Sequence, residues 1–210
     1  DAQAAGKASI KNIDQRIAEV LGTEASEIDI RDMAVNPISN SIYFAVHANG
    51  DQPVILKLVK EEFTAMPLND VSYSSISLNA PIAEDAKDRR GRSQRNWAVS
   101  DLSFYQGQVM VSGLSNKEFS STFRSIQFPF EEKQTLSSLA IYHAAHGRYE
   151  TYAPIKAFTA AKVGGEDHLI ASYTCTPLVV FPMSNLQPDK HVKGRPVAEL
   201  GNWNTPLDLI

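Results

Sequence analysis

Hydrophobic and polar residues alternate in short segments along this chain, and turn residues separate the segments. Residues 28–35 form one such segment, which contains Asp32, and residues 41–46 form a second with alternating small and large apolar side chains. Residues 36–40, which include Asn, Pro and Ser, lie between them. This pattern is typical of antiparallel strands joined by a turn, so the sequence predicts a β-hairpin here.

The hairpin pattern is repeated along the chain. A second copy has Asp101 in the position of Asp32, and the turn Gln106-Gly107 follows it. A third, less faithful copy has Ala157 at this position, and a further copy begins around Asp208. Self-similarity of this kind is the signature of a repeat architecture.

Each copy continues into further strand-like segments that make it a four-stranded meander. These additional strands are predicted at residues 53–59, 71–78, 139–143, 148–152, 178–183 and 197–200. A four-stranded antiparallel meander is the unit of a propeller blade. We therefore expect an all-β fold, a partial β-propeller of about three four-stranded antiparallel blades plus the start of a fourth, with one N-terminal helix.

Three segments depart from the strand pattern. Residues 1–27 are expected to form an N-terminal extension and an amphipathic helix, which either packs on its own domain or docks with a partner. The blades then occupy residues 28–210. Insertions are expected near residues 79–96, which are rich in charge, and near residues 114–135, which are rich in serine and aromatic side chains.

The predicted blade count has a consequence for assembly. Propellers have four to eight blades, and an open one would expose strand edges and an apolar blade face. We therefore expect the partner to be another protein chain or the remainder of a longer protein that contains this one.

Composition limits the other partners. A net charge of -4 argues against nucleic-acid binding, which needs a basic surface. No apolar run approaches the roughly 18 residues of a membrane span. The segment that starts at Asp1 resembles a protein after signal-peptide removal, so we expect a periplasmic or secreted protein. A single cysteine excludes an internal disulfide framework.

The recurrent carboxylates are the first candidates for a site. Asp32, Asp101 and Asp208 would converge near the central channel if they occupy equivalent blade positions, where they could bind Ca²⁺ or share acid–base work. Alternatively, each carboxylate accepts hydrogen bonds from neighbouring backbone amides, as turn chemistry favours.

A second set of candidates contains softer ligands. His143 and His146 form His-x-x-His, which would share one face of a helix but point to opposite sides of a hairpin that turns through His146-Gly147. Cys175 is either a buried inert thiol or, with His168 nearby, a nucleophile or copper ligand.

The charged insertion offers a contact surface. Its basic residues could grip an acidic partner or polyanion, or simply form an exposed, solvated loop. These candidates are Arg89, Arg90, Arg92 and Arg95.

The Asp-led strand, the turn and the following Ile-Tyr-Phe-Ala-Val strand, repeated at blade length, resemble secreted bacterial β-propellers. The resemblance implies architecture, and fold does not give function. We expect a binding or scaffold module. One alternative is a Ca²⁺-dependent hydrolase of lactonase or esterase type with a central-channel site. Another is a redox or copper-associated accessory protein that uses His143, His146, Cys175 and Met183.

Overall fold

The computed structural model describes residues 9–36, 38–174, 177–201, 204, 206, 208 and 209. Strands make up 49% of these described residues, which also contain one α-helix and three sheets, and this confirms the all-β class. The chain divides into two compact units, Asp1–Tyr73 and Ser74–Ile210. None of the described helices is long and apolar enough to cross a membrane.

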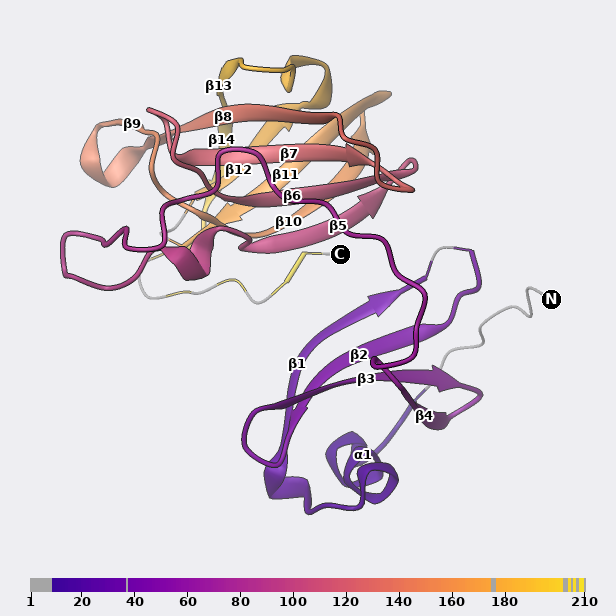
Figure 1. Cartoon of the computed structure of the whole chain (residues 1–210). Coiled ribbons are helices and arrows are strands. Elements are labelled where there is room, and N and C mark those ends of the chain that lie inside the picture. The colour runs from indigo at the N-terminus through magenta and orange to yellow at the C-terminus, as the bar shows by residue number, and fades with distance from the viewer. Residues whose placement is uncertain are drawn as a thin grey trace. The chain divides into compact units, whose positions relative to one another are not determined.

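The first unit contains a four-stranded antiparallel meander (Figure 1). After the short 3-10 helix η1 (Ala25–Glu27), the strands are β1 (Ile28–Val35), β2 (Ile42–Ala48), β3 (Gln52–Val59) and β4 (Glu62–Met66). The fourth strand was predicted at residues 71–78, which form no strand. The chain turns earlier because Lys60 and Glu61 both adopt positive φ, at 49° and 67°, and close a two-residue hairpin loop.

Helix α1 (Ile13–Leu21) packs on this sheet. Ile17 is fully buried in a cluster with Phe44, Val46 and Leu56. The helix ends where Gly22 adopts φ of 68° and donates its N–H to the carbonyl of Ala18. The amphipathic face is therefore used within its own unit.

The second unit begins with another meander, formed by β5 (Asp101–Tyr105), β6 (Gln108–Leu114), β7 (Ser121–Gln127) and β8 (Gln134–His143). The short strands β9 (Arg148–Glu150) and β13 (His191–Lys193) pair with β8, the latter in parallel. The segment 114–135 is thus not an excursion, since it contains the central strand β7. The serines of this segment suggested an exposed loop, but they are buried in the sheet: Ser121 is 2% exposed.

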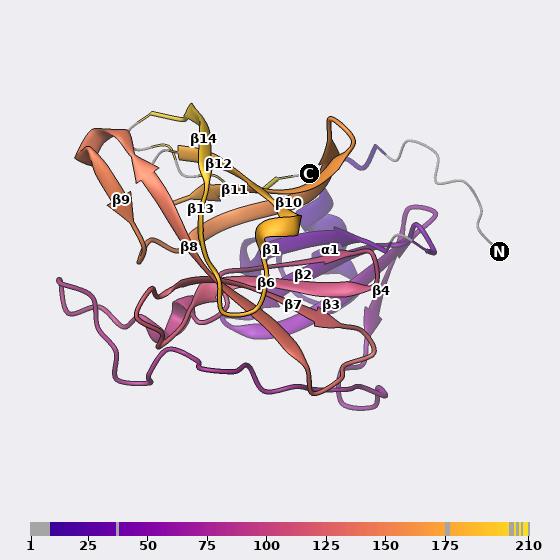
Figure 2. The same ribbon diagram turned by 90° about the horizontal axis from the view of Figure 1, so that it is seen from above.

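The third sheet contains β10 (Ile155–Val163), β11 (Glu166–Tyr173), β12 (Pro177–Pro182) and β14 (Arg195–Glu199). The 3-10 helix η4 (Met183–Asn185) follows β12. The sequence predicted this meander closely. Its inner face packs on the β5–β8 sheet through a shared core that includes Met110, Phe123, Phe158, Leu169 and Phe181 (Figures 1 and 2).

The segment 74–100, which includes η2 (Arg95–Trp97), covers the opposite face of the β5–β8 sheet. The Gln134 side chain donates to the Ser77 carbonyl at 2.6 Å and accepts from the Asn79 N–H at 3.2 Å. The buried Arg124 donates to the Asn79 carbonyl at 3.2 Å. Because a Cβ at Gly113 would clash with the Ala98 carbonyl, glycine permits this close approach.

The described residues form neither a closed barrel nor a closed propeller. What the structure shows is three sheets, each with four antiparallel strands that neighbour one another in chain order; in the third sheet β13 departs to pair with β8 before β14 returns.

Candidate functional site

The site is built on the hairpin formed by β8 and β9. Ile141 pairs with Glu150, and Tyr142 pairs with Tyr149, so each pair shares one side of the two-stranded ribbon. His143 is two residues from Ile141 and therefore lies on the same side as Glu150. Ile141, His143 and Glu150 are all buried, at 2%, 1% and 5% exposure.

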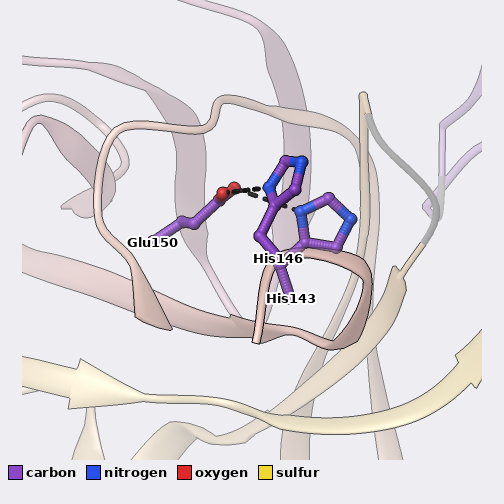
Figure 3. A group of neighbouring side chains, drawn as sticks. All are labelled: His143, His146 and Glu150. Atoms are coloured by element: carbon purple, nitrogen blue, oxygen red, sulfur yellow. Dashed lines mark hydrogen bonds and ion pairs between the residues drawn. The ribbon is translucent and has the colours of Figure 1, made fainter. Parts of the chain in front are cut away.

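A short 3-10 helix, η3 (Ala144–His146), forms the tip of the hairpin. Gly147 ends it with φ of 62°, a conformation that glycine adopts without steric cost. This helical turn brings the His143 and His146 rings together, with centroids 4.2 Å apart (Figure 3). The hairpin was predicted, but the expectation that the two rings point to opposite sides of it was wrong.

The Glu150 carboxylate lies next to both imidazole rings (Figure 3). His146 Nδ1 lies 2.6 Å from Glu150 Oε1, and His143 Nδ1 lies 3.3 Å from Oε2. The Tyr152 hydroxyl donates to Oε1 at 3.4 Å, and Arg148 Nε lies 3.9 Å away from the same oxygen. The carboxylate is therefore oriented from several sides.

The charge of Glu150 is maintained despite its burial. Burial raises the pKa of this carboxyl, but the hydrogen bond with His146 and attraction to His143 and His146 lower it more. The pKa of Glu150 therefore lies below its usual value, and the carboxylate is ionised at neutral pH.

These three side chains form a potential ligand set. His143, His146 and Glu150 each offer one ligand atom, and the three atoms lie within 4.8 Å of one another. Across the described part of the chain, this is the one group of three or more such residues. Sequence reasoning missed Glu150, although its position four residues after His146 was a usable signal.

The other side of the hairpin carries exposed aromatic rings. Tyr142 and Tyr149 are 41% and 47% exposed and stack edge to face with centroids 5.5 Å apart. Lys193 Nζ lies 4.6 Å from the centre of the Tyr149 ring. Amphipathic rings of this kind are common at binding surfaces.

The three recurrent aspartates share one local geometry. Each carboxylate accepts a hydrogen bond from the next residue's backbone N–H, at 2.7 Å for Asp32, 2.8 Å for Asp101 and 2.7 Å for Asp208. This is the backbone-capping alternative considered for the sequence.

Asp101 has a second role. Its other carboxylate oxygen accepts the Phe158 N–H of β10 at 2.7 Å, which joins the two sheets of the second unit. Phe158 follows Ala157, the residue at which the sequence repeat predicted no carboxylate, and its N–H donates to Asp101 of the neighbouring sheet.

The basic insertion forms an ordered turn around Asp88. Asp88 Oδ1 accepts the N–H groups of Arg90 and Arg92 at 2.8 and 2.9 Å, and Oδ2 accepts Arg92 Nε at 2.7 Å. Arg89, Arg90 and Arg92 are exposed, whereas Arg95 is half-buried and donates to the Ile82 carbonyl. Arg95 is therefore a structural residue of this loop.

The candidates His168 and Met183 lie outside the cluster of His143, His146 and Glu150. Cys175 lies outside the described residues. Met183 packs against the core of the second unit, and His168 Nδ1 lies 3.0 Å from the Glu166 carbonyl oxygen.

Comparisons with protein-family models, with curated proteins and with solved structures find no match to this chain.

Proposed function

We propose that this chain forms part of an extracytoplasmic β-propeller that acts as a binding or scaffold module. The single observation that carries the proposal is a series of three sheets, each of which contains four antiparallel strands that neighbour one another in chain order, with only β13, which joins the second sheet, interposed between β12 and β14. Such a series is how propeller blades follow one another.

The repeated aspartate geometry supports the same proposal. Asp32, Asp101 and Asp208 each accept a hydrogen bond from the backbone N–H of the next residue. The link from Asp101 to Phe158 adds a fixed connection between the two sheets of the second unit. Shared local contacts are expected when one supersecondary unit is repeated.

The remaining blades come from another chain or from further sequence of the same protein. A ring needs at least four blades, and three meanders leave strand edges that another sheet would cover. The turn around Asp88 offers a contact for an acidic partner, because Arg89 and Arg90 are exposed and their backbone is held in place.

The proposal is tested by the mass of the chain in solution, measured by light scattering during size-exclusion chromatography. We expect the purified chain to associate, giving a mass above the 23.1 kDa of one copy. A stable, monodisperse monomer that needs no partner would contradict the proposal.

A charge reversal locates the contact. If the loop around Asp88 forms the contact, replacing Arg89 and Arg90 by glutamate is expected to reduce association. Replacing the exposed Lys11 and Lys133 by glutamate is the control. Equal loss in both double variants would mean that general charge, and not this loop, controls association.

A further inference from the structure

We propose that His143, His146 and Glu150 bind one divalent transition-metal ion, Zn²⁺, at the tip of the β8–β9 hairpin. The site differs from the predicted channel site, since it uses none of the recurrent aspartates. It also does not depend on the propeller proposal, because it lies on a single hairpin of the second unit.

The ligand spacing is close to what zinc requires. Tetrahedral zinc with bonds of about 2.1 Å places its ligand atoms about 3.4 Å apart. The three ligand atoms already lie within 4.8 Å, and the closest contacts from Glu150 are 2.6 Å to His146 and 3.3 Å to His143. To reach the zinc geometry, the widest pair closes by at most roughly 1.4 Å and the closest pair opens by roughly 0.8 Å, which side-chain rotation allows.

The surroundings hold the ligands in place. His143 and Glu150 are anchored on paired strands and buried, so little side-chain entropy is lost when they bind a metal. The Tyr152 hydroxyl contacts Glu150 as an outer-shell partner, of the kind that orients metal-binding carboxylates.

The neighbouring cation Arg148 does not block the site. Arg148 Nε lies 3.9 Å from Glu150 Oε1, beyond hydrogen-bond distance, and its side chain is 57% exposed. The guanidinium can therefore move into solvent when a metal ion takes its place next to the carboxylate.

The ligand types select the metal. Imidazole nitrogens favour zinc and its neighbours over calcium, which prefers six to eight oxygen ligands. His146 is 51% exposed, so the metal would be reached from solvent on that side. Three protein ligands with an open fourth position are the arrangement of zinc sites that bind water or substrate.

Isothermal titration of the full chain with ZnCl₂ tests the proposal. We expect one Zn²⁺ per chain and no heat of binding with CaCl₂ under the same conditions. His146→Ala changes a half-exposed side chain and is expected to weaken zinc binding at least about tenfold while the metal-free melting temperature stays near that of the wild type. Glu150→Gln, which keeps the shape of the side chain, is expected to weaken it similarly.

His47→Ala is the matched control, because His47 also pairs with a carboxylate, Asp51, at 2.6 Å. It is expected to leave the zinc affinity unchanged. The proposal is overturned if zinc does not bind at one per chain, if His146→Ala and Glu150→Gln bind it as tightly as the wild type, or if His47→Ala loses it.

Discussion

Several single side chains in the second unit link segments that are far apart in the chain. Asp101 joins β5 to β10, Gln134 holds the segment 74–100, and Arg124 donates from a fully buried position to the Asn79 carbonyl. Burial lowers the pKa of Arg124, since a charge is costly in the interior. Polar residues in this unit therefore specify which segments meet.

Asp101→Ala is expected to lower the free energy of unfolding by about 1–3 kcal/mol, because the N–H of the buried Phe158 loses its acceptor. Urea denaturation measures the loss. Asp32→Ala, which removes only a cap on the N–H of the following residue at an exposed position, is expected to cost about 0.5 kcal/mol or less. Equal losses would show that the link between the two sheets contributes nothing.

At the scale of elements, the connection between β13 and β14 depends on one glycine. Gly194 donates its N–H to the Ala140 carbonyl at 2.8 Å, next to the side chains of Val179 and Phe181. A Cβ at this position would clash with both side chains. The chain can pass from one sheet to the other here only because residue 194 has no side chain.

Gly194→Ala is therefore expected to destabilise the protein by about 1–3 kcal/mol, as overpacking does. Thermal unfolding of Gly194→Ala, Phe181→Leu and the double variant measures the effect. Since Phe181→Leu shortens the side chain that meets the new methyl group, the double variant should lose less stability than the sum of the two. If the stability losses of the two single variants add up in the double variant, the new methyl group does not clash with Phe181.

Several elements could be predicted from the sequence, and the exceptions have physical causes. The hairpins at Gln106-Gly107 and Gly164-Gly165 carry the expected turn residues and were predicted. The turn at Lys60-Glu61 has none of these residues, so β4 was assigned too late in the chain. The His143–His146–Glu150 cluster depends on a single turn of 3-10 helix, which the alternating pattern on either side conceals.

At the scale of the whole molecule, each unit has a hydrophobic core of its own. Leu56 is fully buried in the first core and Leu169 in the second. Burial alternates along β2 and β12, whereas β6 and β8 are buried on both faces over most of their length. The boundary between the units could not be predicted from alternation, since the strand pattern continues on both sides of it.

Separate cores predict separate responses to mutation. Leu56→Ala is expected to cost about 2–5 kcal/mol in the first unit and to reduce amide hydrogen-exchange protection in β1–β4 while leaving β10–β12 unchanged. Leu169→Ala should give the reverse pattern. Loss of protection in both units from either variant would mean that the chain unfolds as one cooperative body.

The parallel pairing of β13 with β8 also constrains the order of events during synthesis. Residues 138–140 on the edge of β8 find their partners at 191–193, about fifty positions later in the chain. A nascent polypeptide leaving the ribosome therefore carries an open β8 edge until the connection after β12 has emerged. During that interval this edge is the place where a chaperone or a second nascent copy would attach.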